Sequence, residues 1–261
     1  MLRILSCVAI VLCVAPAWAE QTQPIKALLV TGGCCHDYKA QKQILTEGLS
    51  ARANVEWDVV YHPSDDRSVK LELYQNANWA EGYDVVVHNE CYGEVNDVAF
   101  VERIAQAHRK TPAVMLHCSA HSYRNAKTDQ WRQVLGITSS SHEKPRPLEV
   151  KNLKPKHPIM RGFPTAWTTP TDELYKVDKL WPNTVPLAQA YGEQTQRDHV
   201  LIWTNTFHGV PVFGTTLGHG NATMESEEFL DLVARGLLWT VGKLDDQGRP
   251  AQGYAGRSSG E

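Results

Sequence analysis

The chain lacks the excess of basic residues that nucleic-acid-binding proteins usually carry, because 26 Lys and Arg stand against 29 Asp and Glu, with a formal net charge of -3. It also lacks internal repeats and the tightly spaced metal-binding motifs HExxH and CxxC. These absences argue against a nucleic-acid partner and against a repeat architecture. The remaining composition, 42% hydrophobic and 21% charged, is that of an ordinary globular protein, and 261 residues favour one domain.

The N-terminus has the pattern of a secretory signal peptide. Arg3 precedes an apolar stretch, Ile4–Val14, that is too short to span a bilayer comfortably, and Ala17-Trp18-Ala19 is a small-x-small cleavage site. We therefore expect a signal peptide over residues 1–19, export to the periplasm if the host is Gram-negative, and no stable membrane insertion after cleavage. A short membrane anchor is the alternative, and no lipobox precedes Cys13.

Cysteine use is compatible with export. Cleavage would remove two of the six cysteines and leave Cys34, Cys35, Cys91 and Cys118. An oxidising compartment permits disulfides, and four cysteines allow three complete pairings. Adjacent cysteines pair with each other only under strain. The sequence leaves the pairing open, including a bond between Cys91 and Cys118.

The first half of the chain alternates strands and helices. Apolar runs predict strands at residues 25–31, 55–61, 83–88 and 112–116, and periodic segments predict helices at 37–49, 98–108 and 128–135. This order favours a parallel sheet with helices on both faces. The second half reads as strands at 146–153, 185–191, 200–205 and 211–217 before a closing helix at 226–241. We expect one α/β domain over residues 20–244 and a disordered tail over 245–261.

Polar side chains follow several of these strands directly. His36 follows the first strand, Glu90 the third, and His117 the fourth, while His219 ends the late hairpin. The first, third and fourth strands of such a sheet are neighbours, roughly 5 Å apart, and ligands bind at their carboxyl ends. The sequence therefore predicts a functional site at this edge of the sheet.

Three chemistries fit such a site. His, Cys and Glu are good zinc ligands, so a divalent metal such as zinc is one candidate. A thiolate at Cys118, placed at a strand-to-helix turn, is a second. The third is metal-free acid–base catalysis by His36, His117 and His219 with a carboxylate, because the histidine pKa lies near neutrality.

The chain resembles the ThuA-like, or trehalose-utilisation, proteins over Lys26 to Leu244. Five segments carry the resemblance in chain order, together with a closing helix: Thr31–Asp37 (TGGCCHD), Leu116–Ala120 (LHCSA), His157–Pro164 (HPIMRGFP), Asp172–Tyr175 (DELY), Pro211–His219 (PVFGTTLGH) and Phe229–Trp239. The resemblance implies a three-layer α/β/α flavodoxin-like fold of the class I glutamine amidotransferase type. Its central sheet would be mostly parallel, with additional antiparallel strands in the C-terminal half.

The same resemblance implies a carbohydrate-related role, often beside enzymes that make or use 3-keto sugars. It assigns Glu173 to the site with His36, His117 and His219 as catalytic candidates. True amidotransferases carry their nucleophile in a Gly-x-Cys-x-Gly pattern, and Leu116–Ala120 lacks both glycines. This departure moves the expectation from Cys118 to His117.

We therefore expect an exported carbohydrate-active enzyme, a hydrolase, lyase or isomerase that acts on a keto sugar or glycoside. The sequence leaves open a non-catalytic carbohydrate-binding module and a Cys118-dependent amidotransferase-like enzyme. The expected partner is a small carbohydrate, and the chain is compatible with a homo-oligomer. The residues expected to bind substrate are Glu90, His121, Arg124 and Tyr175.

Overall fold

The structure is a computed structural model that describes residues 22–256. The predicted signal peptide and residues 257–261 lie outside the described residues. Among the described residues, no helix combines the length and the apolar character needed to cross a membrane.

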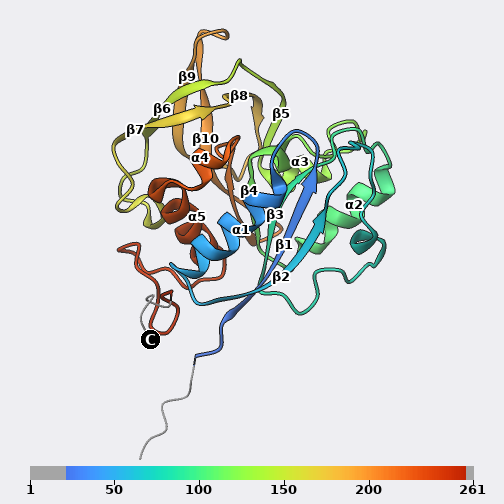
Figure 1. Cartoon of the computed structure of the whole chain (residues 1–261), viewed down its shortest axis with the longest axis horizontal. Helices are drawn as coiled ribbons and strands as arrows, with labels where there is room; N and C mark the ends of the chain where they lie inside the picture. The colour runs from blue at the N-terminus through green and yellow to red at the C-terminus, as the bar shows by residue number, and fades with distance from the viewer. Residues whose placement is uncertain (1–21, 257–261) are drawn as a thin grey trace, which may run out of the picture.

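A nine-stranded sheet forms the middle layer (Figure 1). Its strands lie side by side in the order β2 (Val55–His62), β1 (Ile25–Gly33), β3 (Val85–Cys91), β4 (Ala113–Leu116), β11 (Val210–Thr215), β10 (Arg197–Phe207), β9 (Val185–Gly192), β6 (Arg146–Asn152) and β7 (Ala166–Asp172). The first five strands in this order pair in parallel, and the remaining pairs are antiparallel. The predicted fold class is confirmed, including the antiparallel C-terminal strands.

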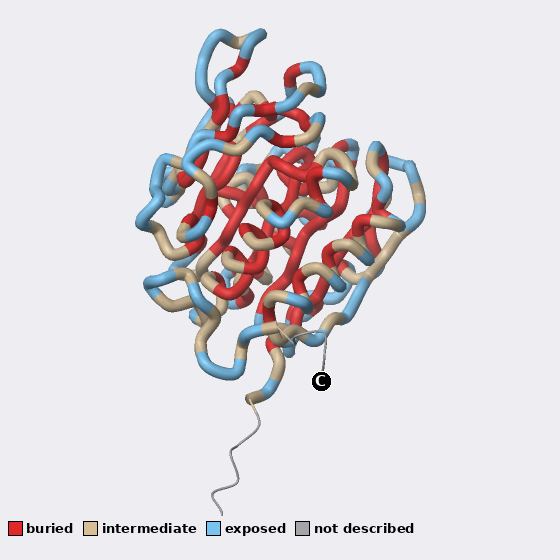
Figure 2. The backbone as a smooth tube through the Cα atoms, turned by 60° about the vertical axis from the view of Figure 1, so that its left-hand side comes forward, coloured by how far each residue is buried: buried red, intermediate tan, exposed pale blue. Residues whose placement is uncertain are grey.

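Helices cover both faces of the parallel part. On one face α1 (Tyr38–Ser50) and α5 (Glu227–Thr240) pack in one apolar cluster, and on the other α2 (Val98–Ala107) and α3 (Gln130–Leu135) pack in a second. Figure 2 shows the central strands as the most deeply buried part of the chain. The helices begin where side chains cap them: Asp37, Asp97 and Ser226 accept hydrogen bonds from the first turns of α1, α2 and α5.

Four short elements complete the fold: η1 (Glu72–Gln75), η2 (His117–Ala120), η3 (Pro158–Met160) and α4 (Asn221–Met224). A separate two-stranded sheet pairs β5 (Ile137–His142) with β8 (Tyr175–Leu180). Neither β5, β7 nor β8 was expected from the sequence. In β7 only two of seven residues are buried, so its sequence lacks the apolar pattern from which a strand is predicted.

The register of the parallel strands aligns their carboxyl ends. Gly33 pairs with Cys91, and Leu116 pairs with Thr215. Gly32 and Gly33 have positive φ, and a Cβ on either would overlap the backbone of a neighbouring strand, at His62 or Cys91. The two glycines therefore allow the close approach of β2 and β3 to the end of β1.

Residues 245–256 differ from the disorder that their composition predicts. The chain forms bridges between Leu244 and Pro250 and between Ala53 and Ala255, and the Asn54 amide donates to the Tyr254 carbonyl. Tyr254 also packs against the core beside α1 and α5. The segment therefore covers the amino-terminal edge of β1 and β2, away from the carboxyl ends of the strands.

The contact between α5 and β11 offers a stability test. A Cβ on Gly236 would overlap the fully buried ring of Phe213, whereas a Cβ on Gly48 in α1 would meet only the terminal methyl groups of Leu230, which can turn aside. We expect Gly236→Ala to lower the free energy of unfolding by about 1 to 3 kcal/mol. The matched control Gly48→Ala, which gains helix propensity, should stay within about 1 kcal/mol of the parent. Urea denaturation measures both, and a Gly236→Ala protein as stable as the parent would contradict the packing described.

Candidate functional site

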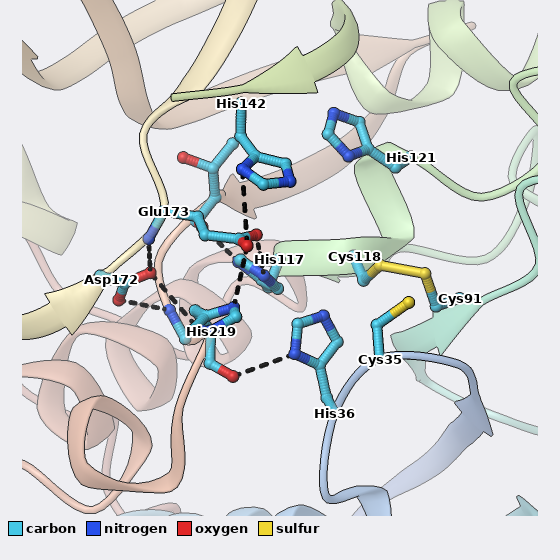
Figure 3. Close-up of polar contacts among 12 residues, drawn as sticks. Cys35, His36, Cys91, His117, Cys118, His121, His142, Asp172, Glu173 and His219 are labelled. Atoms are coloured by element: carbon cyan, nitrogen blue, oxygen red, sulfur yellow. Dashed lines mark hydrogen bonds and ion pairs between the residues drawn. A yellow bond between two sulfur atoms is a disulfide. The ribbon is translucent and has the colours of Figure 1, made fainter. Parts of the chain in front are cut away.

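Three histidines from three parts of the chain meet at the carboxyl edge of the sheet (Figure 3). His36 follows β1, His117 begins η2 directly after β4, and His219 lies in the loop after β11. Their ring centroids are 4.7 Å (His36–His117), 5.1 Å (His36–His219) and 5.6 Å (His117–His219) apart. One nitrogen of each ring lies within 4.8 Å of those of the other two. The parallel register thus brings together residues up to 183 positions apart.

The backbone of His117 is in the left-handed region, with φ of 40°. A non-glycine residue in this region costs conformational energy, and such residues often occur at functional sites. In many α/β enzymes the reacting side chain occupies such a sharp strand-to-helix turn. In this chain the first residue after the strand is His117, and Cys118 follows it.

Hydrogen bonds to backbone carbonyls fix the orientation of two of the rings. His117 Nδ1 donates to the Thr216 carbonyl at 2.6 Å, and His36 Nδ1 donates to the His219 carbonyl at 3.0 Å. Because carbonyl oxygens only accept, each Nδ1 carries a proton, and in the neutral ring Nε2 keeps its lone pair. Burial, reinforced by His117 and His219, lowers the pKa of His36 to about 3. The His36 ring is therefore neutral at physiological pH.

The carboxylate of Glu173 lies against this cluster. Its oxygens are 3.5 Å from His117 Nε2 and 3.4 Å from His219 Nδ1. Burial by itself raises the pKa of Glu173, but the contacts with His117 and His219 outweigh it and hold that pKa well below its ordinary range. The same contact with Glu173 raises the pKa of His219, against the opposing effect of burial. Glu173 is thus an ionised carboxylate among imidazoles.

The buried carboxylate of Asp172 positions both Glu173 and His219. One oxygen accepts from the Glu173 amide at 2.8 Å and from the His219 amide at 3.2 Å, and the other accepts from the Gly218 amide at 3.0 Å. Asp172 ends β7, and Glu173 lies in the turn to β8.

A cavity of about 350 Å³ opens beside these residues. Its wall includes His36, Glu173 and His219 and three of the residues expected to bind substrate, His121, Arg124 and Tyr175. The His121 and Tyr175 rings stack with centroids 3.8 Å apart, and Arg124 donates to the Ser140 carbonyl at 3.0 Å. The volume lies at the lower end of the range for small-ligand pockets.

Glu90 does not reach the cavity, in contrast to its expected role in substrate binding. It is fully buried, and one carboxylate oxygen is 2.9 Å from the Tyr74 hydroxyl, 3.3 Å from the Tyr123 hydroxyl and 2.8 Å from His88 Nδ1. Successive side chains of a strand point to opposite faces of the sheet. Glu90 points to the same face as His88, the face that α2 covers, and therefore away from the cavity.

Two cavity residues were not expected from the sequence. His142, at the end of β5, pairs in register with Tyr175, and its Nδ1 is 3.4 Å from the Glu173 carboxylate. Arg67 reaches the cavity wall from the loop after β2. Predicting that β5 pairs with β8, the strand that begins at Tyr175, would have placed His142 at the site. Nothing in the local sequence distinguishes Arg67.

The four cysteines are paired as Cys34–Cys35 and Cys91–Cys118. All four line the cavity. In this state Cys118 holds no free thiol, so the reading in which Cys118 is a nucleophile requires prior reduction.

The layered sheet with polar residues at its carboxyl edge is the fold of class I glutamine amidotransferase-like proteins. A GMP synthase subunit from Thermoplasma acidophilum shares it with a TM-score of 0.50 and 12% identity, over 82% of this chain and 96% of that one. The chain belongs to the ThuA family, described as trehalose utilisation, whose model matches residues 26–240.

Two further solved structures are similar to this one. A ThuA-like protein from Parabacteroides merdae ATCC 43184 has a TM-score of 0.67 and 20% identity, over 90% of this chain and 98% of that one. A carbohydrate deacetylase, Agd3, has a TM-score of 0.52 and 12% identity, over 84% of this chain and 33% of that one. A comparison with curated protein sequences finds no match.

The role of Asp172 can be measured as stability. We expect Asp172→Ala to lower the free energy of unfolding by about 2 to 4 kcal/mol, because three backbone amides lose their buried acceptor. Asp198, an exposed carboxylate in β10 that accepts only from the Gln189 side chain, is the matched control, and Asp198→Ala should change stability by less than about 0.5 kcal/mol. Equal effects of the two substitutions in chemical denaturation would contradict this role of Asp172.

Proposed function

We propose that the protein is an exported enzyme that acts on a keto sugar or a glycoside in the cavity lined by His36, Glu173 and His219, with His117 in contact with them. One observation carries the proposal: three imidazoles converge on a buried, ionised carboxylate at the wall of a small cavity. The family description, trehalose utilisation, supports a carbohydrate substrate. So does the name of one protein of this fold, a carbohydrate deacetylase.

The histidine cluster fits a divalent metal such as zinc. His117 Nε2 and His219 Nδ1 are buried and, among residues 22–256, make no hydrogen bond beyond their 3.5 and 3.4 Å ion-pair contacts with Glu173, and the neutral His36 ring adds a lone pair. Three histidines with an open fourth position form a common catalytic zinc site, and the carbonyl partners of His36 and His117 orient their rings as metal-binding histidines require. When bound, the metal would supply Lewis acidity to a substrate carbonyl or a water molecule.

Glu173 is the proton acceptor in this proposal. Its ionised carboxylate takes a proton from a substrate hydroxyl, from a water molecule, or from a carbon next to a keto group. His142 contacts the same carboxylate at 3.4 Å through Nδ1, which also donates to the Glu143 carbonyl at 2.8 Å, and its 40% exposed side chain lies between Glu173 and solvent. This arrangement supports hydrolysis of a glycoside and isomerisation or elimination of a keto sugar alike.

Other residues of the cavity wall bind the sugar. Arg124 and Arg67 offer guanidinium donors for sugar oxygens, and the stacked rings of His121 and Tyr175 form a rigid boundary. Arg124 passes close to Gly93, where a side chain would crowd its guanidinium. The two disulfides beside the cavity support export, because disulfides persist in oxidising compartments.

The metal can be tested without a substrate. We expect the protein, stripped with chelator and titrated with zinc in a calorimeter, to bind one equivalent. Alanine at His36, His117 or His219 should weaken binding by about 100-fold or more, since even the partners of metal ligands contribute 10- to 100-fold. His208→Ala, in the turn between β10 and β11, is the matched control and should bind as the parent does. Unchanged affinity in all three site variants would remove the metal from the proposal.

Catalysis is tested on 3-keto sugars and glycosides, trehalose derivatives first. We expect Glu173→Gln to lower kcat by about 10²- to 10⁴-fold, because the amide keeps the shape but accepts no proton. Arg124→Ala should raise KM by about tenfold or more through the loss of charged hydrogen bonds. Cys118→Ser should keep its activity.

Three outcomes would contradict this reading. Full activity of Glu173→Gln would remove the carboxylate from the chemistry. Loss of activity in Cys118→Ser alone would favour the thiol mechanism. Saturable sugar binding in a calorimeter without turnover, with zinc present, would identify a carbohydrate-binding module.

A further inference from the structure

The four cysteines are gathered at one side of the cavity although they come from three segments of the chain. Cys34 and Cys35 follow β1, Cys91 ends β3, and Cys118 lies in η2 after β4. Cys34, Cys91 and Cys118 form a small buried cluster with Tyr38. The sulfurs of Cys34, Cys35 and Cys91 lie within 4.8 Å of one another. Two structural crosslinks would not need such proximity.

The four cysteines line the cavity but differ in exposure. Cys35 is exposed, whereas Cys34, Cys91 and Cys118 are 5 to 6% exposed. Cys34 Sγ is 3.7 Å from Cys91 Sγ, so one disulfide abuts the other. Arg67 Nη2 is 3.8 Å from Cys35 Sγ, where its positive charge favours a thiolate. An external thiol therefore has one accessible sulfur to attack, and a second disulfide lies behind it.

We propose that these four cysteines form a thiol–disulfide exchange relay that carries reducing equivalents from an external dithiol to Cys118. A thiolate of the dithiol attacks Cys35 Sγ, the Cys34–Cys35 bond breaks, and Cys34 leaves as a thiolate. Cys34 then attacks Cys91 Sγ to form Cys34–Cys91, and the Cys91–Cys118 bond breaks. Cys118 leaves as a thiolate and takes up a proton.

The second thiol of the donor completes the exchange. It attacks the donor sulfur of the mixed disulfide, the donor becomes a cyclic disulfide, and Cys35 leaves as a thiolate beside Arg67. In sum the dithiol loses two electrons and two protons, and the protein changes from two disulfides to one disulfide, Cys34–Cys91, with thiols at Cys35 and Cys118. The relay stands apart from the proposed sugar chemistry, since it needs neither the histidines nor a metal.

The relay changes the cavity. Cys118 follows His117 directly and lines the cavity wall. The oxidised protein presents a disulfide at this position, and the reduced protein presents a thiol. The redox state of an external dithiol thereby decides whether a nucleophilic sulfur is available beside the histidines.

A pair of single substitutions tests the relay, because removing either Cys34 or Cys35 leaves a thiol on the other. In Cys35→Ser, purified without reductant, the Cys34 thiolate is 3.7 Å from the second disulfide in the parent structure. We expect a Cys34–Cys91 bond and a free Cys118. In the matched control Cys34→Ser, we expect a free Cys35 and an intact Cys91–Cys118 bond. Circular dichroism verifies that both variants fold.

Alkylation of the folded proteins followed by tryptic mass mapping reads out the pairing, because trypsin places Cys91, Cys118 and the adjacent pair on three different peptides. The parent treated with one equivalent of dithiothreitol should carry labels on Cys35 and Cys118 and retain Cys34–Cys91. A Cys35→Ser protein with alkylated Cys34 and an intact Cys91–Cys118 bond would overturn the relay. So would a parent in which reduction stops at Cys34 and Cys35.

Discussion

The aligned ends of four parallel strands are the constraint on which the rest of the molecule depends. Hydrogen bonding of β1, β3, β4 and β11 in one register forces the residues that follow each strand to the same edge. Three of those strands deliver the histidines, and the ends of β1, β3 and β4 deliver the cysteines. The glycines at the end of β1 keep the neighbouring strands at hydrogen-bonding distance up to the last pair. Sheet geometry alone thus concentrates nearly all of the reactive side chains in one place.

The antiparallel half of the sheet supplies the carboxylates that contact the histidines of the parallel half. Glu173 comes from the turn after β7, at the far edge of the sheet, and reaches the histidines because Asp172 holds the amides of Gly218 and His219. One buried carboxylate therefore joins the turn after β7 to the loop after β11. Among the described residues, the ionised Glu173 beside it contacts imidazoles and no Lys or Arg, so its charge is balanced by groups that also exchange protons.

The parts of this arrangement that the sequence predicts are those with an apolar signal. The strand before His36 and the strand before His117 are continuous buried runs, so their order and the convergence of their ends follow from general rules for parallel sheets. Glu173 was expected only through the resemblance to known proteins, whereas His219 was already a candidate from its place at the end of the late hairpin. All residues of β3 are buried, so its sequence does not show which face of the sheet Glu90 points to. The strands β5, β7 and β8 were not predicted because few of their residues are buried. Arg67 and His142 reach the cavity through contacts that local sequence does not encode.

The position of the two chain ends has a practical consequence. Residues near Thr22 and Gly253 lie against each other, and the Tyr254 carbonyl pairs with the segment that leads into β2. The cavity is at the other end of β1, a strand of nine residues and therefore about 30 Å long. Figure 1 shows the chain entering and leaving on the same side. Attaching the protein to a surface at Thr22 or Gly253, for single-molecule or biosensor work, leaves the mouth of the cavity facing the solution.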